Sequence, residues 1–272
     1  MTTEPARSVD AMREQIRLAL VAWQFLTRVP LGAALEAWIM WTPERLRASA
    51  RYFSLVGMIV GAFGALVFFL ATLAFGQTLG AILSITATAV MTGAFHEDGF
   101  VDYFDSFGAA GDRAKALAIM KDSRIGTFGA IALVLLCAIK VAALIELPIW
   151  LAVAAIIASH SLGRVAACVV MYRLDYVRDT DLSKAKPLAE KMTRTELLLA
   201  VALGLAPLAF IAALGLITLL WTAVALLASV LLVAMFIRHL RARLGGFTGD
   251  TLGAVEQLTE LTILLVFVAA SR

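Results

Sequence analysis

The strongest constraint on this chain is a series of long apolar stretches separated by short polar segments. Six of the stretches can cross the hydrocarbon core of a bilayer, which takes about 20 apolar residues; a seventh carries Glu256 and Glu260. Only 16% of the 272 residues are charged, whereas a soluble domain carries about a quarter. The pattern predicts an all-α, polytopic bundle of about seven transmembrane helices. We expect the spans near 53–76, 78–96, 127–147, 148–172, 195–214, 216–237 and 252–270.

The distribution of Lys and Arg predicts the orientation of these spans. The turns near positions 77, 147 and 215 contain neither residue. Basic loops remain on the cytoplasmic side of a membrane. We therefore expect a cytoplasmic N-terminus, an external C-terminus and a multi-pass protein whose long polar segments all face the cytoplasm. The basic segments are the N-terminal arm, 97–126, 173–194 and 238–250.

The chain reads as a single membrane domain, residues 1–272. Residues 1–52 form a cytoplasmic or interfacial arm, and residues 53–272 form the bundle with its cytoplasmic loops. Within the arm, the apolar patch from Leu18 to Leu26 is too short to span a bilayer. It is expected to lie along the membrane interface.

Residues 96–110 place carboxylates directly after an apolar stretch. In a helix, Asp98, Asp102 and Asp105 fall at positions i, i+4 and i+7, on one narrow face. Three carboxylates on one face repel one another, and a divalent metal is the usual partner. Oxygen ligands favour Mg²⁺, Mn²⁺ or Ca²⁺ over zinc. The alternative is an ordinary solvated helix start.

A second polar segment, 120–129, combines small and hydroxyl residues with Lys121 and Arg124 immediately before an apolar stretch. The exposed amides of a helix start, next to cations, favour phosphate oxygens. A plain helix start with basic residues that anchor to lipid headgroups is an equally good interpretation of the spacing.

A third polar segment, 245–254, contains glycines that permit close backbone approach. Asp250 is either a helix cap or a functional acid, with Gln257 and Glu260 further along the same helix. An acid inside a membrane span usually marks a working cavity. We therefore favour a functional role for Asp250 over a role as a helix cap alone.

Several other polar residues lie inside the spans. Arg164 is placed to snorkel to the headgroups or to face acids or a substrate phosphate inside the bundle. Lys140 and Glu146 are expected to pair locally, and His160 to form a helix–helix hydrogen bond. Acids that hold a metal, together with cations around phosphates, favour phosphoryl-group chemistry. A channel or carrier would not need the basic segments.

The order of these motifs resembles that of the cobalamin synthases, the adenosylcobinamide-GDP ribazoletransferase family. The resemblance covers almost the whole chain. It implies transfer of phosphoryl-cobinamide from adenosylcobinamide-GDP to α-ribazole or its 5′-phosphate, with release of GMP and with Mg²⁺ as the metal. The matching segments are 25–30, 53–57, 93–108, 120–129 and 245–260.

The resemblance also assigns site residues. Asp98, Asp102 and Asp105 fit the family pattern D-G-x-x-D-x-x-D, and Asp250 fits T-G-D. We expect Asp98 and Asp102 to bind the metal and Asp105 to accept the proton of the attacking hydroxyl. The other expected metal ligands are Asp250 and Glu260, and the expected substrate-binding residues are Lys121, Ser123, Arg124, Arg164 and Thr248.

The expected partners are the two substrates, the lipid bilayer and other cobalamin-assembly enzymes; no nucleic acid is expected. The expected location is the cell inner membrane, with the active site facing the cytoplasm. The alternatives are a membrane carrier for a divalent metal or a corrinoid, and a non-catalytic scaffold for cobamide assembly.

Overall fold

The structure, a computed structural model, describes residues 4–122, 124–177 and 191–272. Within these residues the secondary structure is helical, apart from one isolated bridge between Tyr176 and Phe247. The predicted all-α class is confirmed. The arm forms α1 (Glu4–Leu26), α2 (Ala33–Ile39) and α3 (Pro43–Ser49), followed by a short 3₁₀ turn, η1 (Ala50–Tyr52).

The apolar stretches form long helices, as predicted. Six helices in the described ranges are long and apolar enough to cross a membrane, and the number rises to seven if one bent pair counts as a span. The protein is therefore a polytopic helical membrane protein. The long helices are α4 (Phe53–Phe75), α5 (Gln77–Thr92), α8 (Thr127–Glu146), α9 (Ile149–Arg173), α10 (Arg194–Ala213), α11 (Leu219–Arg243) and α12 (Gly249–Ala270).

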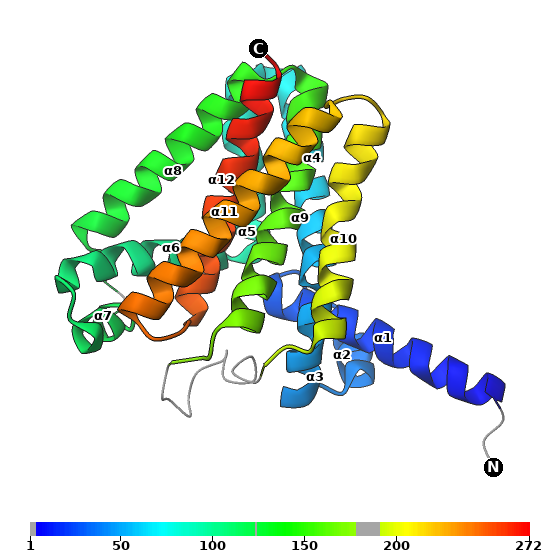
Figure 1. Cartoon of the computed structure of the whole chain (residues 1–272). Helices are drawn as coiled ribbons and strands as arrows, with labels where there is room; N and C mark the ends of the chain where they lie inside the picture. The colour runs from blue at the N-terminus through cyan, green and yellow to red at the C-terminus, as the bar shows by residue number, and fades with distance from the viewer. Residues whose placement is uncertain (1–3, 123, 178–190) are drawn as a thin grey trace.

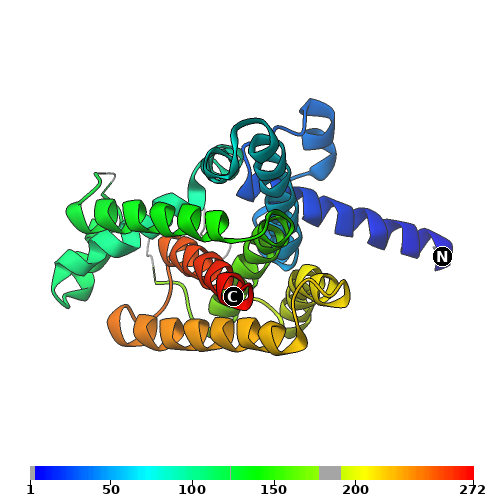
Figure 2. The same cartoon turned by 90° about the horizontal axis from the view of Figure 1, so that it is seen from above.

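The helix α9 forms the centre of the bundle, with α4, α10 and α12 packed around it (Figure 1). Glycines allow this close packing: a Cβ on Gly61 of α4 would lie 3.0 Å from the Cα of Ile157 in α9. The view from above shows α12 between α8 and α11 (Figure 2). The helices that carry buried polar residues, α9 and α12, are therefore shielded from lipid.

The two ends of the bundle differ. Short turns at Gly76, at Pro148 and at 214–218 lie at the same end as the C-terminus. We call this the short-loop end. The opposite, polar end carries the arm, α7 (Arg113–Ile119) and the 244–248 segment (Figure 1). The polar segments 97–126 and 244–248 therefore meet at one end, as the charge pattern predicted.

The predicted span 78–96 is wrong at its C-terminal end. The helix α5 stops at Thr92, and the chain bends by 93° into α6 (Phe95–Asp105). Gly93 and Ala94 form the corner with φ values of 68° and 53°. Two successive left-handed residues cannot continue a right-handed helix. The acidic motif consequently lies on a separate helix that crosses the bundle, followed by η2 (Ser106–Ala109).

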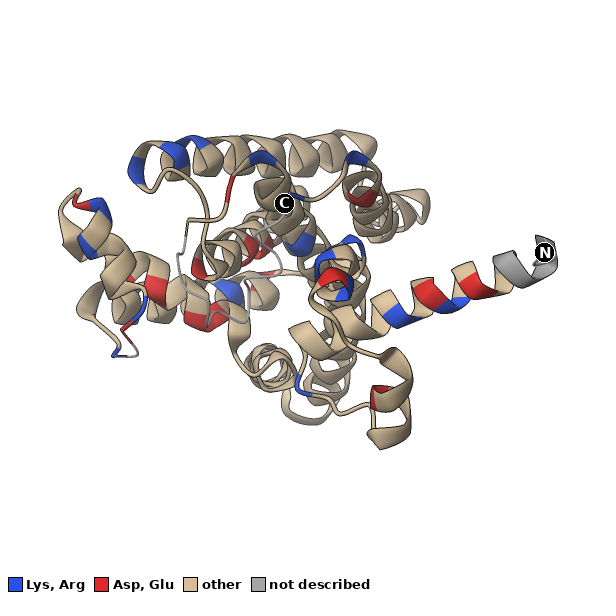
Figure 3. Ribbon diagram, turned by 90° about the horizontal axis from the view of Figure 1, so that it is seen from below, with Lys and Arg blue, Asp and Glu red and all other residues tan. Residues whose placement is uncertain are grey.

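The position of the patch from Leu18 to Leu26 along the membrane interface stays a prediction. The patch is the C-terminal part of α1, and its residues Leu18, Val21 and Leu26 are buried. Val21 and Leu26 pack in the core that α3 and α4 share, so this apolar patch docks α1 onto the bundle. The N-terminal part of α1 projects away and carries charges of both signs (Figures 1 and 3).

Candidate functional site

The predicted acidic segments meet where α6 crosses the start of α12. A Cβ on Gly99 would lie 2.9 Å from the Cα of Asp250, and a Cβ on Gly253 would lie 2.7 Å from the carbonyl oxygen of His96. Only glycine permits this approach at both positions. The crossing therefore sets the backbone of Asp250 against the first turn of α6, immediately beside Asp98.

The three acids of α6 have different environments. Asp98 is exposed, Asp102 is half-buried and Asp105 is buried. Asp250 is half-buried in the first turn of α12, where the helix dipole favours a carboxylate. Asp98, Asp102 and Asp250 thus all retain access to solvent or to a ligand at the α6–α12 crossing.

Asp105 is held by the start of α8. Its Oδ2 accepts a hydrogen bond from the backbone amide of Gly126, and its Oδ1 accepts one from that of Gly129, both at 2.7 Å. The predicted anion site at this helix start therefore exists, but a carboxylate of the chain itself occupies these two amides. This contact fixes the second polar segment against the acidic helix.

Of the predicted phosphate-binding residues, Lys121 and Arg124 are exposed on the segment before α8. The Arg124 guanidinium binds the Asp122 carboxylate, with Nη2 2.6 Å from Oδ2. Hydrogen bonds from Arg124 lower the pKa of Asp122 below its ordinary value. Ser123 lies outside the described residues. The segment can present one ammonium and one guanidinium to an anion near α6.

Thr248 serves as the N-cap of α12. Its side chain accepts a hydrogen bond from the amide of Thr251, and the Thr251 hydroxyl accepts one from the amide of Thr248. The Thr248 Oγ1 atom also lies 3.4 Å from Asp250 Oδ2. This buried cap orients the first turn of α12, so its contacts favour positioning of Asp250 over direct contact with substrate.

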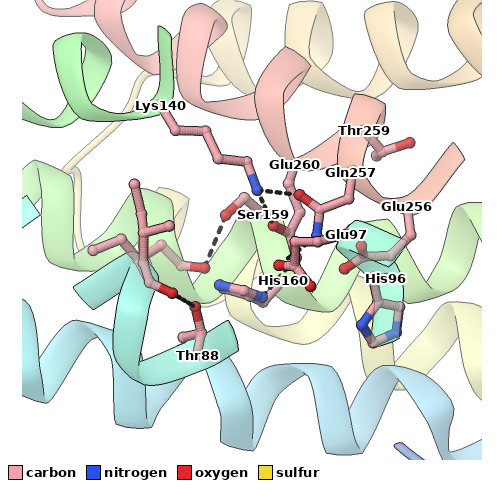
Figure 4. A network of polar contacts seen from close by, with 12 residues as sticks. Thr88, His96, Glu97, Lys140, Ser159, His160, Glu256, Gln257, Thr259 and Glu260 are labelled. Carbon is pink, nitrogen blue, oxygen red and sulfur yellow. Dashed lines mark hydrogen bonds and ion pairs between the residues drawn. The ribbon is translucent and has the colours of Figure 1, made fainter. Parts of the chain in front are cut away.

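A second cluster of ionisable residues lies deep inside the bundle (Figure 4). Lys140 reaches from α8 to α12 and donates to Gln257 and to Glu260, at 2.6 Å in each case. The other carboxylate oxygen of Glu260 lies 2.6 Å from His160 Nδ1 and 2.5 Å from Arg164 Nη1. Arg164 also pairs with Glu256. We call these six residues the buried ion network.

The network also contacts the first turn of α6. Gln257 Nε2 donates to Glu97 Oε1 at 3.2 Å, and Arg164 Nη2 lies 3.5 Å from His96 Nδ1. His96 and Glu97 directly precede Asp98. The buried ion network thus connects α8, α9 and α12 to the helix that carries the exposed acids.

Arg164 and Glu260 both belong to the buried ion network. Arg164 faces acids, one of the two alternatives for this residue, and is 3% exposed. Glu260 follows Asp250 by ten residues on α12, which corresponds to about 15 Å along a helix. Its carboxylate binds Lys140, His160 and Arg164. It therefore lies far from Asp250 along the helix. The substrate-binding role of Arg164 and the metal-binding role of Glu260 stay predictions.

Two groups of residues offer ligand atoms for a divalent cation. In the described part of the chain, His160, Glu256 and Glu260 have ligand atoms within 4.8 Å of one another. Lys140 and Arg164 already supply cationic partners there, so a divalent ion would meet two positive charges. Asp98, Asp102 and Asp250 do not converge as tightly, but they are a hard oxygen donor set at an accessible crossing. The aspartate set fits Mg²⁺ better.

Sequence reasoning missed the partner of Lys140. The expected pair with Glu146 is wrong: Glu146 Oε2 lies 2.9 Å from Arg272, at the short-loop end. The hydrogen bond predicted for His160 takes the form of its contact with Glu260. The partner could have been predicted, because ionisable groups inside membrane spans usually pair with one another across helices.

Comparison with known proteins covers nearly the whole chain. The family model described as cobalamin-5-phosphate synthase matches residues 18–268. The chain is 43% identical over 263 residues to an adenosylcobinamide-GDP ribazoletransferase of Leptothrix cholodnii, covering 95% of this chain and 97% of that protein. Proteins with the same name from Shewanella frigidimarina and Vibrio cholerae are 39% and 37% identical, over 94% and 95% of this chain and 95% of each relative.

No solved structure matches the chain. The match of the family model and of the full-length relatives nevertheless agrees with the helix pattern and with the two polar segments that meet at α6 and α12. The chain belongs to the cobalamin-5-phosphate synthase family.

Proposed function

We propose that this chain transfers the phosphoryl-cobinamide group of adenosylcobinamide-GDP to a ribose hydroxyl of α-ribazole or of its 5′-phosphate. The hydroxyl oxygen forms a bond to the phosphorus next to the cobinamide. The anhydride bond breaks, GMP leaves with the bridging oxygen, and the hydroxyl proton passes to a base. The products are adenosylcobalamin, or its 5′-phosphate, and GMP. The names of the relatives support this substrate pair.

The observation that carries the proposal is the close crossing of α6 and α12 at Gly99 and Asp250. It brings an accessible acid of one helix beside two accessible acids of another, at the end of the bundle where the polar segments gather. Phosphoryl transfer depends mainly on positioning and on compensation of the phosphate charge. A membrane carrier needs a pathway between both sides, and the three aspartates Asp98, Asp102 and Asp250 lie at one end.

We propose that Asp98, Asp102 and Asp250 hold Mg²⁺, which would compensate the charge of the anhydride oxygens when bound. The two α6 acids are one helical turn apart, and Asp250 approaches from α12. Glu260 is not included, because its carboxylate already pairs with three cationic or hydrogen-bonding groups. Lys121 and Arg124, on the segment that Asp105 fixes to α6, would bind phosphate oxygens.

The role of Asp105 as the proton acceptor stays a prediction. Its two backbone hydrogen bonds and its burial favour a positioning role, in which it holds the basic segment beside α6. In that case the more exposed Asp98 or Asp102 takes the proton. Thr248 would orient Asp250, and Ser123 remains a candidate for contact with phosphate.

We further propose that the protein lies in the cell inner membrane with the polar end toward the cytoplasm. The basic residues of the polar segments support this orientation. The nucleotide substrate and product would then be exchanged on the cytoplasmic side, where other cobalamin-assembly enzymes are candidate partners.

One assay distinguishes the enzyme from the two alternatives, a membrane carrier and a non-catalytic scaffold. Purified protein is incubated with Mg²⁺, adenosylcobinamide-GDP and α-ribazole, and GMP is measured with each component omitted in turn. The enzyme releases GMP only when donor and acceptor are both present. A carrier would move a corrinoid or a metal into sealed vesicles without acceptor. A scaffold would retain partner binding after Asp98→Asn and would release no GMP in any mixture.

A further inference from the structure

A groove of about 590 Å³ lies between α9, α10 and α11, apart from the α6–α12 crossing. Its floor is α9 and Thr259 of α12, and its walls are α10 and α11. The helices α10 and α11 are joined at the short-loop end and diverge toward the polar end (Figure 1). The groove opens in the wedge between them, in the part of the bundle that meets lipid.

The lining of the groove has a regular pattern. On α9 it follows one helical face from Leu162 to Arg173, and on α11 it follows one face from Leu226 to Arg241. The residues between these ends are apolar except for Ser229, whose hydroxyl donates to the carbonyl of Ala225 at 2.8 Å. Each apolar stripe therefore ends in an arginine at the polar end of the bundle.

The two arginines lie close together. Arg241 Nη2 donates to the backbone carbonyl of Arg173 at 3.2 Å, and both side chains are exposed. In the described ranges no carboxylate pairs with either guanidinium. Two neighbouring positive charges at the mouth of an apolar groove, at the level where membrane helices end, are complementary to a phosphate attached to a hydrocarbon chain.

A second groove serves as an internal comparison. It measures about 530 Å³, lies between α4, α9 and α10, and is lined by residues such as Trp150, Pro207 and Phe210 with no charged side chain. Ordinary lipid tails can fill such a space. The two arginines distinguish the first groove from this apolar one. They would make the first groove prefer a lipid with a negatively charged headgroup.

We propose that the groove between α9, α10 and α11 binds an anionic phospholipid, with one acyl chain along the apolar stripes and the headgroup phosphate on Arg173 and Arg241. The stripe on α11 runs over 16 residues, from Leu226 to Arg241, which is about 22 Å of helix. The hydrocarbon layer of one leaflet is about 15 Å deep. The groove is therefore long enough for an acyl chain that enters from the leaflet on the polar side.

The test measures lipid bound to the purified full-length protein by native mass spectrometry. Dioleoyl phosphatidylglycerol and dioleoyl phosphatidylcholine are titrated in parallel. We expect preferential retention of phosphatidylglycerol. Each substitution, Arg173→Gln or Arg241→Gln, should weaken phosphatidylglycerol binding about fivefold and leave phosphatidylcholine binding unchanged. Val230→Trp, which fills the exposed apolar wall, should weaken the binding of both lipids.

Arg238→Gln is the matched control, because Arg238 is an exposed arginine on the same helix and does not line the groove. If Arg238→Gln weakens phosphatidylglycerol binding as much as Arg173→Gln or Arg241→Gln, the lipid preference comes from general surface charge and the proposal is overturned. Equal retention of the two lipids by the unchanged protein would also overturn it, as would complete competition by glycerol phosphate, which lacks the acyl chain. Cross-links between two copies of the Val230→Cys variant, with no bound lipid, would show a second copy in the groove and overturn the proposal.

Discussion

The Oδ1 atom of Asp105 accepts a hydrogen bond from the backbone amide of Gly129 at 2.7 Å. The other oxygen of the same carboxylate accepts from Gly126. One side chain thereby joins the end of α6 to the beginning of α8, and it compensates the positive end of the α8 dipole. Because a Cβ at position 126 or 129 would collide with the carboxylate, the two glycines and the aspartate form one structural unit.

Substitution of Asp105 by Asn should lower the free energy of unfolding by about 1–3 kcal/mol, because one oxygen acceptor is replaced by an amide donor that faces a backbone N–H. Gly129→Ala should cost a similar amount through the collision. Thermal unfolding in detergent measures both changes. Gly108→Ala is the control, since its Cβ would meet only Phe128, at 3.9 Å.

The same variants separate the two roles of Asp105. If it only positions α8, Asp105→Asn and Gly129→Ala lower the rate of GMP release in proportion to their loss of stability. If Asp105 is the base, Asp105→Asn lowers the rate by about 10²–10⁴ while Mg²⁺ and donor binding are retained, whereas Gly129→Ala has a much smaller effect.

Removal of a metal-binding carboxylate should affect the Mg²⁺ dependence itself. For Asp98→Asn, Asp102→Asn or Asp250→Asn we expect a rate of GMP release lower by about 10²–10³, as for loss of one charge-stabilising contact. The Mg²⁺ concentration for half-maximal rate should rise. Asp112→Asn is the control, because Asp112 is an exposed cap of α7. An unaltered Mg²⁺ response in all three variants would remove this ligand set.

The pairing of Lys140 with Glu260 predicts a strong coupling inside the membrane. Lys140→Met leaves a buried acid with less compensation and should destabilise the protein by about 3–5 kcal/mol. Lys140→Met with Glu260→Gln should recover a large part of the loss. Glu146→Gln, which breaks an exposed pair with Arg272, should change stability by under about 1 kcal/mol. Additive effects of Lys140→Met and Glu260→Gln would contradict direct coupling.

The sequence was sufficient to predict the long helices, because a bilayer imposes their length and their apolar composition. It also placed Asp98, Asp102 and Asp105 on one helix. The corner at Gly93 and Ala94 was not predictable from hydropathy, since the apolar residues continue through it to Phe95. Left-handed backbone at Ala94 is a tertiary effect that propensity does not reveal.

The partners of buried groups were the least predictable part of the site. Lys140 and Glu260 are 120 residues apart, and spacing along one helix says nothing about which facing helix will supply an ion. The local rule favoured Glu146, which is on the same helix as Lys140. Similarly, the sequence predicted that backbone amides at the start of α8 bind an anion. In the structure, the anion is the Asp105 carboxylate and not a phosphate.

The orientation of the bundle is tested by a reporter fused after Gly111. The segment is exposed at the polar end, and its basic neighbours favour the cytoplasm. An alkaline phosphatase fusion at this point should be inactive, and a green fluorescent protein fusion should fluoresce. Fusions at the turn near Gly215, at the short-loop end, should behave in the opposite way. The reverse pattern would invert the topology.

The contact between α1 and α3 within the arm should weaken at acid pH. Glu14 of α1 lies 2.8 Å from the Arg45 guanidinium of α3. The hydrogen bond from Arg45 lowers the pKa of Glu14 below its ordinary value of 4.5. Docking of α1 is therefore strongest above pH 4.5 and weakens as the pH falls through the lowered pKa.

Protease cleavage of α1 measures this contact. Cleavage within α1 is measured with pepsin at acid pH and with trypsin, which cuts after Arg13 and Arg17, at neutral pH. Cleavage by pepsin should accelerate as the pH falls. Glu14→Gln should be cleaved faster at neutral pH and should lose most of the pH dependence, because its neutral amide cannot titrate. Equal pH dependence in both proteins would assign the effect to another acid, with the exposed pair of Asp10 and Arg13 as the first group to test by Asp10→Asn.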